Sequence, residues 1–90
     1  MMRQGRQVLG AIPGVLKVFT GQAVRGDAQY RYCWLIRFAH STVIDSYREH
    51  PAHKNFADTL FRPNAKERIS IDYLETGNES AYQSFRIIIW

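Results

Sequence analysis

Hydrophobic and polar positions alternate most regularly between residues 30 and 38. The even positions of this segment are all aromatic or apolar, whereas Arg31 and Arg37 occupy odd positions. Alternation with a period of two predicts a β-strand with one buried face. Runs rich in β-branched and aromatic residues predict further strands at 15–24, 68–74 and 84–90.

Three helical segments are predicted around these strands. Residues 3–12 carry apolar residues at helical spacing until Pro13 stops them. A second helix spans 41–50, and a third begins at Pro51, because a proline at the first helical position loses no hydrogen bond. That segment is expected to end near residue 62. The order helix, strand, strand, helix, strand, strand predicts one α+β domain over residues 1–90, with helices on one face of an antiparallel sheet.

Composition and charge narrow the class of protein. The chain is 46% hydrophobic and 22% charged, as in an ordinary globular domain. Its formal net charge is +4, but the basic residues are spread evenly, so we expect neither nucleic acid nor a membrane as a partner. The single Cys33 lies in an apolar run and is expected to be a small buried residue, which favours the reducing cytoplasm.

The segment YREHPAHKNF, residues 47–56, carries the candidate chemistry. Histidine titrates near neutral pH, and a nearby tyrosine can orient a proton, so the pair can perform acid–base work. Each residue also has a structural alternative: His50 as a helix-junction residue, His53 as a buried polar group, and Tyr47 as part of the core. His50 and His53 lack a convincingly placed carboxylate or thiol partner, so no metal site is predicted.

The pattern Tyr-x-x-His-Pro-x-His-x-x-Phe resembles the signature of the Dabb family, the stress-responsive A/B barrel domains. Gly21 and the segment SIDY ending at Tyr73 are also similar to that family. The resemblance implies a ferredoxin-like antiparallel sheet with two helices on one face. It also implies a dimeric α+β barrel, in which two sheets pack together. The expected partner is therefore a second copy of the chain. Its sheet is expected to cover the face that carries the even positions of 30–38.

The family's first strand should precede Val8, where this chain has none. The C-terminal segment SFRIIIW resembles that strand, and a hairpin turn at 76–79 would bring it into the vacant slot beside the last strand. We therefore expect residues 84–90 to take the place of the usual first strand. The alternatives are an unrelated tail and a strand exchanged with a partner.

Some Dabb proteins resemble cofactor-free cyclases of polyketides, in which a tyrosine and a histidine of the motif carry the reaction. The matching residues are Tyr47 and His53. The resemblance implies that His53 removes a proton from a carbon next to a carbonyl, while Tyr47 stabilises the oxyanion by hydrogen bonding. No cofactor is required.

A ligand pocket follows from the same resemblance. The cyclase type has histidines where this chain has Tyr32 and Arg86, and Arg86 can receive an anionic group instead. Asp72 and Tyr73 are assigned no chemistry.

Two classes of function stay open: an enzyme or binding module for an aromatic or polyketide-like molecule, and a non-catalytic stress-associated protein that assembles. The expected ligand-binding residues are Tyr32, Trp34, His50, Phe56 and Arg86, with Ile88 and Trp90 added to the wall if the tail fills the slot.

Overall fold

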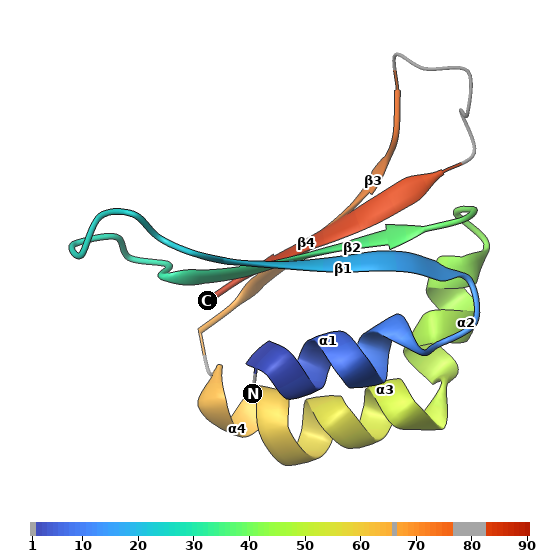
Figure 1. Cartoon of the computed structure of the whole chain (residues 1–90), viewed down its shortest axis with the longest axis horizontal. Helices are drawn as coiled ribbons and strands as arrows, with labels where there is room; N and C mark the ends of the chain where they lie inside the picture. The colour runs from blue at the N-terminus through green and yellow to red at the C-terminus, as the bar shows by residue number, and fades with distance from the viewer. Residues whose placement is uncertain (1, 66, 77–82) are drawn as a thin grey trace.

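The computed structural model describes residues 2–65, 67–76 and 83–90. It forms an α+β fold in which one four-stranded antiparallel sheet is covered by helices on one face (Figure 1). The predicted strands and helical segments are confirmed, with ends shifted by a few residues. The elements are α1 (Met2–Gly10), β1 (Val15–Gln22), β2 (Tyr32–Phe38), α2 (Val43–Glu49), α3 (Pro51–Phe56), the π-helix η1 (Ala57–Phe61), α4 (Arg62–Asn64), β3 (Ile69–Leu74) and β4 (Ser84–Ile89).

The C-terminal strand β4 occupies an inner position of the sheet. The strand order is β1-β2-β4-β3, and β4 runs antiparallel to both of its neighbours. Ile88 lies opposite Trp34 on one side and opposite Ser70 on the other. The expectation that this segment fills an inner slot is therefore confirmed, within a single chain. Most of the hairpin turn expected at 76–79 lies outside the described residues.

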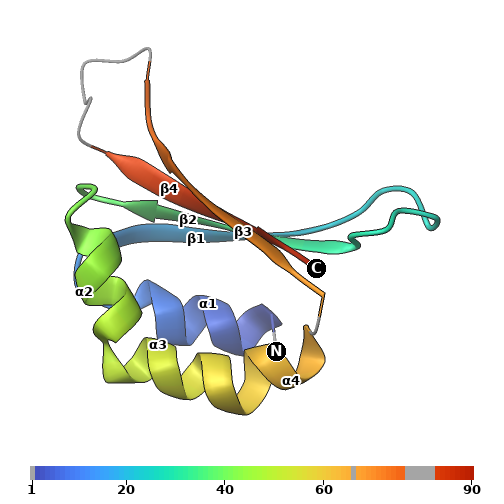
Figure 2. The ribbon, with the colours of Figure 1, turned by 180° about the vertical axis from the view of Figure 1, so that it is seen from behind.

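The core lies between the helices and the face of the sheet that they cover. Figures 1 and 2 show α1 and α3 side by side beneath this face. Buried and partly exposed positions alternate along β4 and along β2 from Cys33 on, as the pattern in the sequence predicted for β2. The buried apolar cluster consists of Leu9, Ile12, Trp34, Ile36, Phe38, Tyr47, Phe56, Phe61, Ala65 and Ile88.

The expectation about which sheet face awaits a second copy was wrong. The even positions from Trp34 to Phe38 are at most 1% exposed, because α1 and the helical segments from α2 to α4 cover them. The opposite face has no helix over it (Figure 2). An apolar row crosses that face on all four strands, since register aligns Phe19 with Leu35, Leu35 with Ile87, and Ile87 with Ile71. The expectation failed because alternation shows only that one face is buried, not what buries it.

Alanine substitutions at two glycines of α1 test how closely this helix packs on the core. A Cβ atom at Gly5 would lie 2.7 Å from Trp34 Cζ2 and 2.9 Å from Phe56 Cζ, whereas one at Gly10 would be 3.9 Å from the nearest side chain. We expect Gly5→Ala to lower the free energy of unfolding by about 2 kcal/mol through overpacking. Gly10→Ala should raise it by about 0.5–1 kcal/mol through helix propensity. Urea unfolding of the two variants measures both changes, and equal effects would contradict this packing.

Candidate functional site

A cavity of about 320 Å³ lies between the helical segment α3–η1 and the inward side of β3 and β4. It exists because the helices do not extend over the edge strand: the inward-facing Ser70 and Asp72 of β3 are exposed. Aromatic side chains form its wall, with Trp34 stacked on Phe61 at 4.9 Å between ring centroids. The lining residues are Leu9, Trp34, Tyr47, Arg48, His53, Phe56, Ala57, Phe61, Arg62, Arg68, Ser70, Asp72, Arg86 and Ile88.

Tyr47 lies near the end of α2 and is fully buried. Its ring packs edge-on against Phe38, with 5.1 Å between centroids. The residue lines the cavity, and its hydroxyl, which is buried, has no hydrogen-bond partner among the described residues. Burial raises the pKa of Tyr47 far above its ordinary value of 10, and the nearby charge of Arg86 only partly opposes this shift. The hydroxyl therefore stays protonated at neutral pH and can donate a hydrogen bond to a ligand.

His53 lies in the first turn of α3, with its ring centroid 4.4 Å from that of Tyr47. Its Nδ1 is 3.2 Å from the carbonyl oxygen of Arg48. A carbonyl only accepts, so Nδ1 carries the hydrogen and Nε2 keeps a free electron pair. Partial burial lowers the pKa of His53 below 6.5; the Arg48 carbonyl opposes this shift, and nearby arginine charges, Arg86 foremost, add to it. The imidazole is therefore a neutral proton acceptor at pH 7.

Arg86 lies at the back of the cavity on β4 and is only 8% exposed. Its Nε and Nη2 donate to the two carboxylate oxygens of Asp72, at 2.6 and 3.1 Å. The two residues are direct partners across β3 and β4. The Arg86 guanidinium also lies 5.5 Å from the centre of the Tyr47 ring. The Arg86 guanidinium, which was expected to receive an anionic ligand group, therefore already binds the carboxylate of Asp72. The sequence had assigned no chemistry to Asp72.

The cavity is also lined by three arginines that the sequence did not indicate as site residues. Arg48, Arg62 and Arg68 come from the end of α2, the start of α4 and the approach to β3, and all three are exposed. Their even spacing along the chain hid their convergence, which depends on how the helical segment folds back beneath the sheet. The sequence signal for them was only that each lies at or beside a boundary of a predicted helix or strand.

The π-helical turn η1 contributes Ala57 and Phe61 to the wall of the cavity. A π-turn holds more residues than an α-turn, and such turns recur at functional sites. The apolar spacing in the sequence predicted a helix here but did not distinguish its type. The extra residue changes which side chains after Ala57 face the sheet.

The structure brings together five of the expected site residues, Tyr47, His53, Trp34, Phe56 and Arg86, around one cavity, which Ile88 also lines. Two others lie elsewhere. Tyr32 faces a separate depression with Trp90, whose ring centroid is 5.8 Å away. His50 caps α3, because its Nδ1 accepts a hydrogen bond from the backbone N–H of Ala52 at 3.1 Å. His50 thus has the helix-junction role weighed from the sequence.

Comparison with known proteins gives one match. The family model of the stress responsive A/B barrel domain matches residues 1–75. No curated protein and no solved structure shows significant similarity to the chain. The matched segment includes Tyr47, His53 and Asp72, whereas the strand β4, which carries Arg86, follows it. Among the described residues, no helix is long and apolar enough to cross a membrane.

Proposed function

Because the chain belongs to the stress responsive A/B barrel domain family, we propose that it is a dimeric α+β barrel protein with a pocket for a small aromatic or polyketide-like molecule. We propose further that Tyr47 and His53 perform cofactor-free acid–base chemistry there. One observation carries this proposal: the cavity is lined by Tyr47, whose buried hydroxyl has no partner among the described residues, and by His53, whose neutral imidazole has a free Nε2. Its volume, near the lower end of the range for ligand pockets, suits a compact molecule of one or two rings.

The chemistry proposed is removal of a proton from a carbon next to a carbonyl. The proton passes to Nε2 of His53, and the electron pair of the C–H bond moves onto the carbonyl oxygen to form an enolate. Tyr47 donates a hydrogen bond to that oxygen without losing its own proton, since its pKa is raised. The carbonyl of Arg48 stabilises the resulting imidazolium through Nδ1–H. In a cyclisation, the enolate carbon then attacks a second carbonyl, and the imidazolium returns its proton to the new alkoxide.

Deuterium exchange at the acidic CH₂ of benzoylacetone in D₂O, followed by NMR, tests the base. We expect the parent protein to accelerate exchange and His53→Gln to lose at least about 100-fold of that acceleration while remaining folded. His40→Gln is the matched control, because His40 lies before α2 and outside the cavity lining. Equal exchange by the parent and His53→Gln would end the enzymatic proposal.

The pH dependence of the same exchange has an expected sign. A base works only when it is deprotonated, so the enzymatic rate should rise with pH through the pKa of His53. Since burial lowers that pKa, the midpoint of the rise should lie below pH 6.5. Tyr47, whose pKa is raised, should cause no fall in rate up to pH 10. A rate that keeps rising between pH 7 and 9 would assign the base to another group.

The uncovered sheet face supports the dimer. It presents Phe19 and Ile71 of the apolar row described above, and Tyr73 two residues after Ile71, each between 42% and 46% exposed. Such a patch marks an interaction surface, and a second copy of the same sheet would cover it. The same face favours the second candidate function, a non-catalytic protein whose role is assembly. Cys33 also lies on this side, half-buried and unpaired, which suits the reducing cytoplasm proposed as its location.

Sedimentation velocity at micromolar concentration tests the assembly. We expect the parent protein to sediment as a dimer and Ile71→Glu to sediment as a monomer. Ile71 is already 46% exposed in the single chain, so this change should leave the fold intact. Val24→Glu is the matched control, since Val24 is fully exposed in the loop after β1 and outside the sheet face. A folded monomeric parent would refute the dimer.

A further inference from the structure

We infer that the ligand of this cavity is an aromatic anion, whose carboxylate or phosphate group is received by Arg48 and Arg68 at the cavity mouth. This inference rests on the proposed function and deepens it by naming the class of ligand. It also moves the expected anion contact away from Arg86, whose charge Asp72 already balances.

The charge of the lining is the first argument. The cavity side chains include four arginines and a single carboxylate, that of Asp72, while His53 is neutral near pH 7. The pair between Arg62 and Asp58 adds one acidic neighbour, which still leaves a positive excess. Like charges gathered around a partly enclosed space repel each other, and a bound anion relieves that repulsion.

The hydrogen bonds that each guanidinium already makes show which of them can still bind an anion. Arg86 uses Nε and Nη2 on Asp72. Arg68 donates from Nη1 to the Ala65 carbonyl, which leaves its other nitrogens available. In the described part of the chain, the Arg48 guanidinium makes no hydrogen bond or ion pair, and it is exposed at the cavity. Arg48 and Arg68 therefore offer the donors that a planar carboxylate or a phosphate prefers.

The aromatic half of the ligand follows from the wall beside these arginines. The Arg68 guanidinium lies 5.9 Å from the ring centre of Phe61, and Phe61 stacks on Trp34. An aromatic ring packed on this wall places a carboxylate or phosphate substituent at the arginines. The buried hydroxyl of Tyr47, unpartnered among the described residues, is an independent sign that a ligand oxygen belongs deeper in the same cavity.

Isothermal titration calorimetry with benzoate, phenyl phosphate and neutral benzyl alcohol tests the inference. We expect at least one anion to bind ten-fold or more tightly than benzyl alcohol, with an advantage that shrinks as salt screens the charges. The better-bound anion distinguishes a carboxylate ligand from a phosphate ligand. Binding of benzyl alcohol as tight as that of both anions, or no binding of either anion, would overturn the inference.

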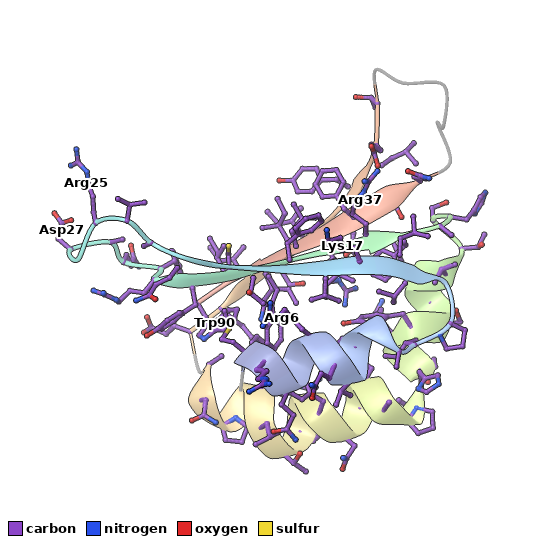
Figure 3. All side chains as sticks on the ribbon, viewed as in Figure 1. Arg6, Lys17, Arg25, Asp27, Arg37 and Trp90 are labelled. Carbon is purple, nitrogen blue, oxygen red and sulfur yellow. The ribbon has the colours of Figure 1, made fainter. Side chains whose placement is uncertain are left out.

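Single substitutions locate the anion. Arg48→Gln and Arg68→Gln should each weaken the tighter anion about ten-fold, as expected for the loss of one charge-assisted hydrogen bond. Arg25→Gln removes the same charge from the tip of the loop between β1 and β2, far from the cavity, and should change nothing (Figure 3). An equal loss of anion affinity in Arg25→Gln would show that only the net charge of the protein matters, and would refute the site.

The two proposals fail separately. Anion binding without any acceleration of benzoylacetone exchange would refute the acid–base function and leave this inference standing. If the protein accelerates benzoylacetone exchange but binds neither anion more tightly than benzyl alcohol, this inference is refuted and the acid–base function stands.

Discussion

Deletion of residues 84–90 should leave the chain unfolded. The segment contains β4, which pairs with both β2 and β3, so its loss removes two ladders of hydrogen bonds and isolates the edge strand. It also removes the buried Ile88 and the Trp90 ring, whose centroid is 5.0 Å from that of Trp34. Each large apolar side chain contributes about 1.5–3 kcal/mol, against a total stability of about 5–15 kcal/mol for a typical domain. Far-ultraviolet circular dichroism and thermal unfolding measure the result.

Two further measurements check the position of this strand in the intact protein. Amide protons of residues 85–89 should exchange slowly, as expected for an inner strand. Ile88→Ala should cost about 2–4 kcal/mol, because Ile88 is 6% exposed, whereas Val24→Ala in the exposed loop should cost almost nothing. A deletion variant that unfolds cooperatively at the parent's temperature, or fast exchange throughout 85–89, would contradict the assignment.

Asp72→Ala should be strongly destabilising for a single surface-edge residue. It would leave the guanidinium of Arg86, whose side chain is 9% exposed, without its carboxylate. Breaking a fully buried pair costs about 3–5 kcal/mol. Since the Asp72 side chain is 38% exposed and water can replace part of the interaction, we expect a loss of about 2–3 kcal/mol in urea unfolding.

The chain offers a matched control for this change. Asp58→Ala breaks the ion pair with Arg62, in which both side chains are more than half exposed, and should cost less than about 1 kcal/mol. The double variant Asp72→Ala/Arg86→Met should recover most of the lost stability, because no charge is then buried without a partner. An Asp72→Ala loss no larger than that of Asp58→Ala would show that Arg86 does not depend on its carboxylate.

The sequence predicted the local elements and the family. Alternation over 30–38 determines which side chains of β2 face inward, because a strand turns successive side chains to opposite faces. Pro13 and Pro51 predicted helix boundaries, because proline lacks the backbone hydrogen-bond donor. The motif from Tyr47 to Phe56 identified the family, and the resemblance of the last strand to the missing first one predicted its inner position. These features depend on neighbouring residues or on the sequence pattern of the family.

Pairing across the sheet decided the rest of the site. Asp72 is opposite Arg86 only because β3 pairs with β4 in one register, and a shift of one residue would separate them. Tyr32 and Trp34 share a face of β2, but Trp34 is buried against Phe56 of α3, whereas Tyr32 is 38% exposed. Local periodicity contains no information about such distant neighbours.

The sequence by itself determined the secondary structure, the side of β2 that faces the core, and the residues Tyr47 and His53 as candidates for chemistry. Only the tertiary structure decided which face of the sheet the helices cover and which face stays open. It also decided that arginines from three separate elements converge on one cavity with those two residues. The physical reason is that periodicity and motifs arise from contacts a few residues apart, whereas the covered face and the charge of the cavity arise from contacts between segments distant along the chain.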